Sequence, residues 1–314
     1  MSTINQRLHV AVGVIRDGDG RILITQRAKH AHQGGLWEFP GGKLEDGEPV
    51  QQALARELAE EVGIQVQSAA PLIKINYDYG DRHVLLDVWN VTVFVGQARG
   101  CEGQAMRWID AEQLQEFSFP AANLPIIAAA QLPCYYAILE GRSATEALDN
   151  CKRILANDIK LLQFRAKSLP IADLQTVFEQ VSQLCRQQQV SLLVNADLPI
   201  DTTNTPGLHL SSHALLACHE RPNGYRWVAA SCHNLDELRR AETLGLDFAV
   251  LAPIQATASH PDTPPLGWQA LAELLEHINL PVFALGGLGR HDLDRALAAG
   301  AQGVAGISAF LTAD

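Results

Sequence analysis

Residues 41–64 read GGKLEDGEPVQQALARELAEEVGI, and this stretch decides how the first half of the chain folds. Its glycines at positions 41, 42 and 47 give the backbone the freedom that a tight turn requires. Gly63 follows the stretch's last apolar turn, where a left-handed residue commonly ends a helix. Apolar residues between these glycines recur every four positions, which predicts a helix with one face on a core: Val50, Leu54, Leu58 and Val62.

A second face of this helix carries three carboxylates. Glu60 and Glu61 follow Glu57 at three and four positions, so the three share that face. They repel one another unless a cation lies among them. Oxygen ligands suit a hard cation such as Mg²⁺, which often shares its shell with substrate phosphates. The alternative is a solvated acidic face, which accounts for many charge clusters.

The full spacing favours the metal site over the solvated face. It runs glycine, five residues, glutamate, seven residues, and then RELAEEVGI. This pattern is the Nudix box, and residues 8–131 resemble the MutT-type 8-oxo-dGTP diphosphatases of the Nudix family. The resemblance extends to segments outside the box, which are 11–16, 24–28, 31–32, 38–43, 81–83 and 120–125.

The resemblance implies an α/β/α sandwich (α+β, with a mixed sheet) and a Mg²⁺-dependent hydrolase, with Mn²⁺ as a second suitable metal. The substrate would be a nucleoside triphosphate, attacked at its β-phosphorus to release a nucleoside monophosphate and pyrophosphate. Arg56 would orient or pair with a carboxylate, and Glu102 would lie near metal or water, although a solvated loop residue explains Glu102 equally well. The implied catalytic residues are Arg56, Glu57, Glu60 and Glu102, and the implied metal-binding residues are Gly41, Glu57, Glu60 and Glu61.

Base recognition has to come from outside the box. By the same resemblance, Asn123 reads the purine edge, because an amide can donate and accept at once, and Phe39 lines the base pocket. The alternative for Asn123, which lies between two prolines, is an ordinary turn residue. The substrate-binding residues implied in this way are Arg27, His32, Glu38, Phe39, Gly42, Asp81, Arg82 and Asn123.

Composition limits the classes of function. The 314 residues are enough for two domains, and 47% hydrophobic with 19% charged residues is typical of a globular protein. A net charge of −11 speaks against binding a nucleic-acid polymer, which demands clustered Lys and Arg. The six cysteines are scattered without a CxxC pair, which favours reduced thiols in a cytoplasmic protein. No signal core or membrane span is predicted, and the oligomeric state is left open.

In the first half, residues 8–15 and 21–26 predict two strands around a hairpin turn at 17–20. Residue 77 and runs 84–88 and 91–95 suggest further strands, and 110–116 a short helix. A helix over 124–131 precedes a seam at Leu132-Pro133, so the expected domains are 1–132 and 133–314.

The second half alternates short apolar runs with helical segments, which predicts a compact parallel (β/α)₈ TIM barrel. The expected strands are 135–139, 159–164, 191–194, 207–210, 227–231, 248–254, 281–285 and 303–307, and the expected helices include 174–186, 235–244, 268–277 and 293–299. This half resembles thiamine phosphate synthases and the related TenI thiazole tautomerases, through segments such as LQFRAK at 162–167 and SCH at 231–233.

The mouth of such a barrel lies at the strand C-termini. The glycine and serine segments there suit a phosphate cradle, so the barrel is expected to bind a phosphorylated ligand. The candidate ligand-binding residues are Gln163, Arg165, Lys167, Asn195, His209, Ser231, His233, Gly286, Gly287, Ile307 and Ser308. His233 fits an acid/base role and a structural hydrogen bond equally well.

The barrel departs from the synthase pattern where metal and phosphate would bind. Ala196 replaces one Mg²⁺-binding aspartate, and SSHA at 211–214 replaces the stretch that carries the other. Asp197 stands one residue beyond the first position, and Ser259-His260 replaces a phosphate-gripping Thr-Lys pair. These changes predict that the barrel lacks synthase activity.

Three hypotheses follow. The first is a Mg²⁺-dependent hydrolase of oxidised guanine nucleotides, fused to a barrel without synthase activity. The second is a bifunctional thiamine-pathway protein whose Nudix half acts on thiamine diphosphate or its analogues, with a synthase- or tautomerase-like barrel. The third makes the barrel a ligand-sensing module that regulates the hydrolase. Fold analogy alone does not choose among them.

Overall fold

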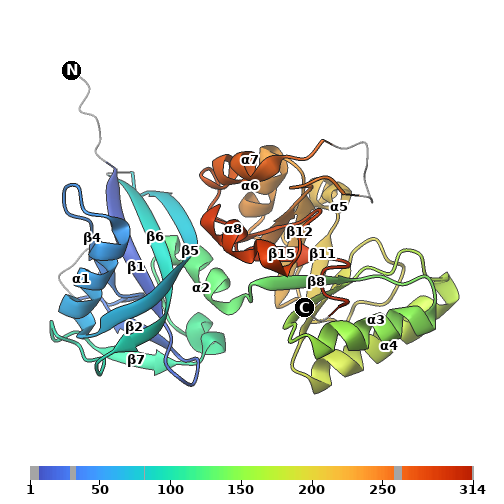
Figure 1. Ribbon diagram of the computed structural model, residues 1–314, viewed down its shortest axis with the longest axis horizontal. Coiled ribbons are helices and arrows are strands. Elements are labelled where there is room, and N and C mark those ends of the chain that lie inside the picture. Colours follow the sequence, from blue (N-terminus) through green and yellow to red (C-terminus); the bar gives the residue numbers. More distant parts are fainter. Residues whose placement is uncertain (1–6, 29–32, 81, 258–263, 313–314) are drawn as a thin grey trace. The chain divides into compact units, whose positions relative to one another are not determined.

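The structure is a computed structural model that describes residues 7–28, 33–80, 82–257 and 264–312. The chain divides into two compact units, residues 1–131 and 132–314, each with its own core (Figure 1). This division falls one residue before the seam expected from the sequence.

Two sheets form the first domain. The larger has the order β4-β1-β6-β5, comprising β4 (Gly41–Lys43), β1 (Leu8–Ile15), β6 (His83–Val95) and β5 (Gln65–Asp78). Strand β1 is parallel to β6 and antiparallel to β4, so the sheet is mixed, as predicted. The smaller sheet has the order β3-β2-β7, comprising β3 (Trp37–Glu38), β2 (Ile22–Gln26) and β7 (Met106–Ile109).

Helices cover both faces of the larger sheet. Helix α1 (Val50–Val62) buries Leu54 and Leu58 in one cluster with Trp89 of β6. Helix α2 (Leu124–Gln131) buries Ile126 in a separate cluster with β-strand residues such as Val88. Because Val88 and Trp89 are successive residues of one strand, the two clusters lie on opposite faces, which makes the α/β/α sandwich. The helix that carries the box is thus fixed directly against the sheet.

Strand β5 is much longer than the sequence indicated, which suggested a strand only at residue 77. It spans 14 residues, and its pairing with β6 is irregular between Val66 and Ser68, between Ser68 and Ala69, and between Pro71 and Ile73. Such bulges break the alternation by which strands are recognised. The two runs expected at 84–88 and 91–95 form one strand, and the expected helix near 110–116 is the 3₁₀ turn η1 (Ala111–Glu116), followed by η2 (Ala121–Asn123).

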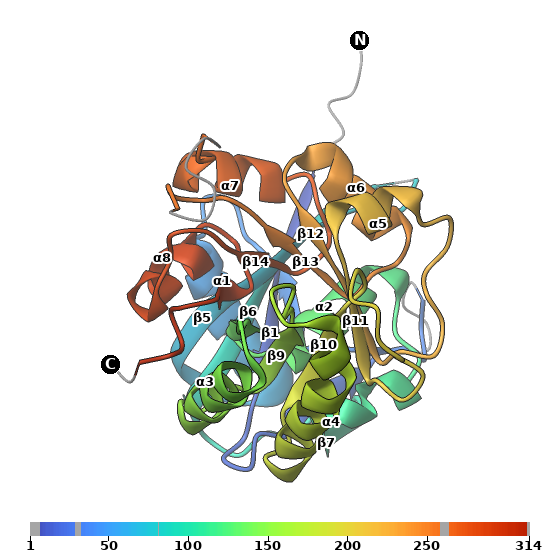
Figure 2. The same ribbon diagram turned by 90° about the vertical axis from the view of Figure 1, so that its right-hand side faces the viewer.

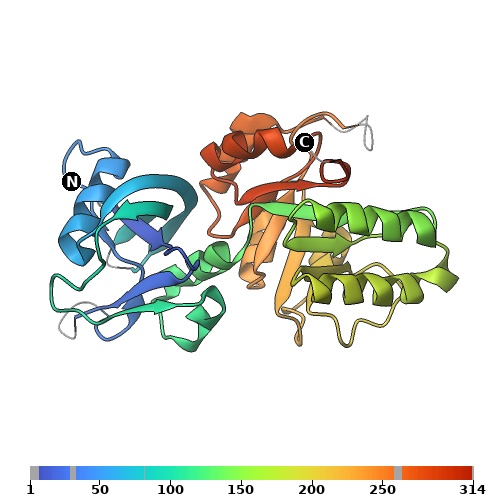
Figure 3. The same ribbon diagram turned by 60° about the horizontal axis from the view of Figure 1, so that its bottom comes forward.

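In the second domain, eight parallel strands of the described chain close into a barrel (Figure 2). They are β8 (Tyr135–Leu139), β9 (Leu161–Phe164), β10 (Ser191–Asn195), β11 (Gly207–Leu210), β12 (Trp227–Cys232), β13 (Phe248–Leu251), β14 (Val282–Ala284) and β15 (Gly303–Gly306). The helical segments are α3 (Ala144–Ala156), α4 (Ile171–Gln187), α5 (Ser212–Ala217), α6 (Leu235–Thr243), α7 (Gly267–Leu275), η3 (Arg290–Asp292) and α8 (Leu293–Ala298). Figure 3 shows α3 and α4 lying along one flank of the strands.

Aromatic residues fill the interior of the barrel. Tyr136, Phe248 and Phe283 are fully buried, and their ring centroids lie 5.3 to 5.6 Å apart. This packed layer closes the interior below the strand C-termini, where buried polar residues begin. No helix among the described residues is both long and apolar enough to cross a bilayer.

Candidate functional site

The two glycines of β4 are approached so closely by other atoms that a side chain at either position would displace them. Gly41 has φ 152°, and a Cβ there would lie 2.1 Å from the carbonyl oxygen of Ala11 on β1. A Cβ at Gly42 would lie 2.1 Å from Oε2 of Glu57. Gly41 therefore lets two strands approach each other, whereas Gly42 lets a carboxylate of α1 lie directly on the strand.

A second carboxylate reaches the same strand. Glu61 Oε2 accepts a hydrogen bond of 2.8 Å from the backbone N–H of Gly41, and Glu61 Oε1 accepts one of 3.2 Å from Thr25 Oγ1. Burial raises the pKa of Glu61, and the nearby charge of Glu102 acts in the same direction. Glu57 and Glu61 thus converge on consecutive residues of β4.

Arg56 organises the opening of the site. It donates to Glu57 Oε1 at 2.7 Å, to Glu48 Oε2 at 2.9 Å and to the carbonyl oxygen of Lys43 at 3.0 Å. Hydrogen bonds to Glu48 and Glu57 raise the pKa of Arg56 above its already high value. The guanidinium is therefore a cation that holds one oxygen of Glu57 in place.

The third box carboxylate points elsewhere. The Glu60 side chain is 62% exposed and meets Arg56 only at 3.4 Å, so the three glutamates of the helix do not share one contact point. No group of three His, Cys, Asp or Glu side chains in the described ranges is already arranged to hold a metal. The donor chemistry still fits a hard cation, because two carboxylates meet at β4, one of them half-buried with a raised pKa.

The loop that carries Glu102 contacts the end of α1. The backbone N–H of Cys101 and the side-chain amide of Gln104 both donate to the carbonyl oxygen of Glu61, at 3.0 and 2.9 Å. Glu102 itself is exposed, and its charge is close enough to influence Glu61. The structure therefore brings the loop to the box, with Glu102 at its edge.

Several expected substrate residues gather beside the box. Arg27 forms an ion pair with Glu38, and burial raises the pKa of Glu38 to about 7. Burial also raises the pKa of Tyr79, which lies within electrostatic range of Arg27, Glu38 and Arg82. His32 and Asp81 lie outside the described residues. The result is a partly buried group of opposite charges and one phenol next to the carboxylates.

Phe39 and Asn123 lie in the same part of the domain. Phe39 is buried and stacks on Phe119, with ring centroids 5.4 Å apart. Asn123 is 8% exposed at the end of η2, and its neighbour Ala122 belongs to the hydrophobic cluster that contains Phe39. The structure therefore buries both side chains, and Phe39 packs in the hydrophobic cluster that Ala122 joins.

The mouth of the barrel begins with buried polar residues. His209 Nδ1 lies 3.0 Å from Tyr136 Oη, and its Nε2 lies 2.9 Å from Ser231 Oγ. Burial lowers the pKa of His209 to about 3, so this imidazole is neutral. Asn195 is buried beside it, paired in register with His209 across β10 and β11.

Charged residues follow the same strands. Lys167 Nζ lies 2.7 Å from Asp197 Oδ2, and Arg165 pairs with Glu140. His233 is exposed, and its Nδ1 lies 3.0 Å from Glu237, to which its backbone N–H also donates. That geometry suits the structural interpretation of His233, because Glu237 already engages the ring.

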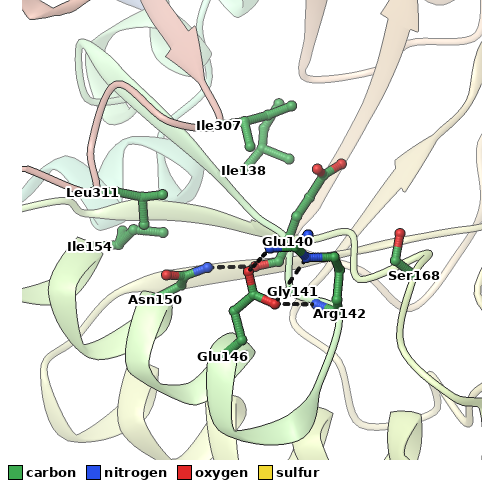
Figure 4. Close-up of a pocket in the computed structure, with 10 residues that line it drawn as sticks. All are labelled: Ile138, Glu140, Gly141, Arg142, Glu146, Asn150, Ile154, Ser168, Ile307 and Leu311. Atoms are coloured by element: carbon green, nitrogen blue, oxygen red, sulfur yellow. Dashed lines mark hydrogen bonds and ion pairs between the residues drawn. The ribbon is translucent and has the colours of Figure 1, made fainter. Parts of the chain in front are cut away.

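The remaining barrel candidates are backbone features. Gly286 has φ 105° and Gly287 φ 68°, and Cβ atoms there would lie 2.9 Å from Pro253 and 2.6 Å from the carbonyl oxygen of Ala256. Close packing therefore requires these glycines independently of any ligand. Ile307 lines a cavity of about 300 Å³ beside α3, and Ser308 follows it in the exposed loop after β15 (Figure 4).

The barrel residues do not fit a Mg²⁺ ion held by two aspartates. Ala196 offers no ligand, and the 211–214 segment offers hydroxyls and one imidazole. The nearby carboxylate of Asp197 is engaged by Lys167 and by Ser211 Oγ at 2.9 Å. Ser259 and His260 lie outside the described residues.

Three contributors were not identified from the sequence. Thr25 and Gln104 fix Glu61, and Tyr79 lies beside Arg27 and Glu38. Thr25 alone gave a signal, as a polar residue among the buried positions of β2. Gln104 and Tyr79 act through loop and hairpin placement, which local sequence does not express.

Two family models match the chain. The model described as thiamine monophosphate synthase matches residues 135–310, and the NUDIX domain model matches residues 11–129. The first covers more than half of the chain.

Individual relatives agree with both matches. The 8-oxo-dGTP diphosphatase of Escherichia coli (strain K12) is 45% identical over 123 residues, which are 39% of this chain and 95% of that protein. The CTP pyrophosphohydrolase of the same strain is 36% identical over 118 residues, 38% of this chain and 87% of that protein. A protein of Aquifex aeolicus (strain VF5), provisionally named thiamine-phosphate synthase 2, is 34% identical over 184 residues, 58% of this chain and 99% of that protein. The chain therefore belongs to the Nudix hydrolases through its first domain and to the thiamine monophosphate synthase family through its second.

Proposed function

We propose that the first domain hydrolyses 8-oxo-dGTP to 8-oxo-dGMP and pyrophosphate with Mg²⁺, and that the barrel binds a phosphorylated ligand without synthase activity. The convergence of Glu57 and Glu61 on Gly41 and Gly42 carries the first part of the proposal. The relative named 8-oxo-dGTP diphosphatase, 45% identical, supports the choice of substrate.

The residues of the box would have different roles in the reaction. Glu57 and Glu61 would hold Mg²⁺ together with the backbone of Gly41, and Glu60 would join them from its exposed position. Mg²⁺, or Mn²⁺ in its place, would neutralise phosphate charge and lower the pKa of a bound water. Arg56 would keep Glu57 directed at Gly42, since it donates to that carboxylate at 2.7 Å. Glu102 would accept a proton from water near Glu61, since its charge is close enough to act on that carboxylate.

The neighbouring residues would select and hold the nucleotide. Phe39 offers a buried aromatic surface, and Asn123 offers an amide that can donate and accept along a purine edge. Arg27 and Arg82 bring positive charge for the sugar and phosphates, with His32 and Asp81 in the adjoining segments. Glu38, whose pKa is raised to about 7, would be partly protonated near neutral pH and could donate to a phosphate oxygen.

The barrel is proposed to be inactive as a synthase because its residues do not fit the metal that a diphosphate leaving group needs. Asp197 is held by Lys167 and Ser211, and Ala196 carries no ligand. A phosphorylated ligand would serve as a regulatory signal to the chain.

One assay tests the hydrolase proposal. Purified protein is incubated with Mg²⁺ and, in parallel, with 8-oxo-dGTP, dGTP, CTP or thiamine diphosphate, and release of pyrophosphate or phosphate is measured. The proposal expects the highest kcat/KM for 8-oxo-dGTP and a loss of that preference in Asn123→Ala. Preferred hydrolysis of thiamine diphosphate would establish the thiamine-pathway alternative instead.

A further inference from the structure

The charged groups around the barrel mouth are already matched with one another. Asp197 Oδ2 lies 2.7 Å from Lys167 Nζ, and its Oδ1 accepts a hydrogen bond of 2.9 Å from Ser211 Oγ. Arg165 pairs with Glu140, which directly follows β8. Both cations that directly follow β9 in the sequence therefore have an acidic partner.

Charged side chains are also paired in the cavity beside α3. Figure 4 shows Glu146 turned toward Arg142, and their Oε2 and Nε atoms lie 3.4 Å apart. Asn150 donates to the carbonyl oxygen of Glu140 at 3.0 Å. Ile138 and Ile307 also line the cavity, and they stand at the ends of β8 and β15. The space open beside the mouth is thus apolar on one side and charge-balanced on the other.

Asp197 is fixed by contacts from three strand ends. Besides Lys167 and Ser211, Asn195 Oδ1 accepts a hydrogen bond from the backbone N–H of Asp197 at 3.2 Å. Partial burial raises the pKa of Asp197, but the hydrogen bonds from Lys167 and Ser211 outweigh it and leave the pKa below its usual value. A phosphate chain that reached Lys167 would therefore meet a fixed negative charge a few ångströms away.

One buried group shows that the mouth is nevertheless suited to a polar ligand. Gln163 is 1% exposed, and its Nε2 has no hydrogen-bond partner in the described part of the chain. In register it lies between Ile138 of β8 and Leu193 of β10, neither of which can accept its proton through a side chain. An unpartnered buried donor is unfavourable, and an acceptor atom of a bound ligand would satisfy it.

We propose that Asp197 is a specificity-determining residue: by neutralising Lys167 it makes the barrel accept a ligand with at most one phosphate, and refuse a diphosphate. This inference rests on the proposed binding of a phosphorylated ligand by the barrel. It assigns the barrel a charge selectivity opposite to that of the Nudix site, where negative phosphates are to be drawn in.

Calorimetric titration with inorganic pyrophosphate in metal-free buffer tests the assignment on the full chain. Removing one like charge near the phosphates should tighten binding about tenfold in Asp197→Asn. The added Lys167→Gln substitution should abolish that gain, which locates it at the barrel. Asp158→Asn is the matched control, because Asp158 Oδ1 lies at the same 2.7 Å from Lys160 Nζ at the opposite end of β9.

The outcomes separate the two proposals. Unchanged affinity in Asp197→Asn, or an equal gain in Asp158→Asn, overturns the role of Asp197. So does a loss of pyrophosphate binding on substituting Lys167→Gln in the parent chain. Titration with inorganic phosphate serves as the second arm. If inorganic phosphate binds the parent chain and Lys167→Gln does not change its affinity, a single-phosphate ligand is supported. If inorganic phosphate does not bind, the proposed barrel ligand is rejected, and the pyrophosphate comparison still tests Asp197.

Discussion

The box helix and the mouth of the barrel both gather acidic side chains, but these acids contact different partners. At α1, Glu57 and Glu61 lie against the backbone of Gly41 and Gly42. Glu57 is paired with Arg56, whereas Glu61 is held by the neutral donors of Gly41 and Thr25. At the barrel, Asp197 contacts Lys167. Glu140 likewise contacts Arg165, and Glu237 contacts His233. Carboxylates held by backbone and hydroxyl donors keep oxygen lone pairs for a metal, whereas acids matched by cations leave a neutral surface.

The largest effect is expected at Glu57. Glu57→Gln keeps the shape of the side chain but removes the charge that a metal needs, so kcat/KM for nucleoside triphosphate should fall by roughly 100-fold or more. Glu116→Gln, on the exposed turn η1, is the control with the same chemical change. Equal activity of the two variants would remove Glu57 from the site.

The two glycines of β4 should respond differently. In Gly42→Ala the added Cβ displaces the carboxylate of Glu57, so activity should fall at least about tenfold while the fold is kept. In Gly41→Ala the Cβ meets the backbone of Ala11 at a φ of 152°, so stability itself should fall by about 1–3 kcal/mol. Thermal unfolding and kinetics measured on both variants distinguish these effects, and full activity in Gly42→Ala would contradict the placement of Glu57.

Acid should weaken the barrel through His209. Its pKa is lowered to about 3 in the folded chain and is near 6.5 when unfolded, so the unfolded state takes up the proton first as pH falls. The contribution of His209 to the free energy of unfolding is present above pH 6.5 and is lost toward pH 3. The free energy of unfolding should fall by about 2 kcal/mol between pH 7 and pH 5. Hydrogen exchange of amides in β9 to β12 measures it, and His209→Gln, which does not titrate, should lack this loss.

The first domain should show a smaller effect of opposite sign at Glu38. Its pKa is raised to about 7, against about 4.5 when unfolded, so the folded state holds the proton more tightly. The contribution of Glu38 to the free energy of unfolding is therefore fully present below pH 4.5 and is lost as pH rises through 7. After allowing for partial exposure, the loss between pH 5 and pH 7 is about 1 kcal/mol. Hydrogen exchange of β2 amides in Glu38→Gln should lack this decline, and an unchanged slope would contradict the burial of this carboxyl.

The sequence predicted elements whose signal is local. Helix α1 ends where Gly63 adopts φ 70°, as the position of that glycine indicated. Each barrel strand begins within two residues of the first residue of an expected apolar run. Strand β5 was not recognised from the sequence beyond residue 77, because its bulges and polar residues hide the alternation of apolar and polar side chains. Its hairpin places Tyr79, so this residue of the site was missed together with its strand.

The partners of individual side chains could not be predicted in the same way. The box spacing indicates that Glu57, Glu60 and Glu61 share a face, yet Thr25 and Gly41 hold Glu61 while Glu60 faces solvent. The pairing of Lys167 with Asp197 joins residues 30 apart in sequence through the closure of the barrel. Such contacts depend on tertiary placement, which periodicity does not encode.

Binding of Mn²⁺, followed by paramagnetic broadening of backbone amide signals, tests the difference between the two sites most directly. We expect the first equivalent to broaden signals of residues 41–43 and 56–62 and to leave those of residues 195–197 and 211–214 unaffected. Broadening that begins at the barrel mouth, or that spares α1 and β4, would contradict the account.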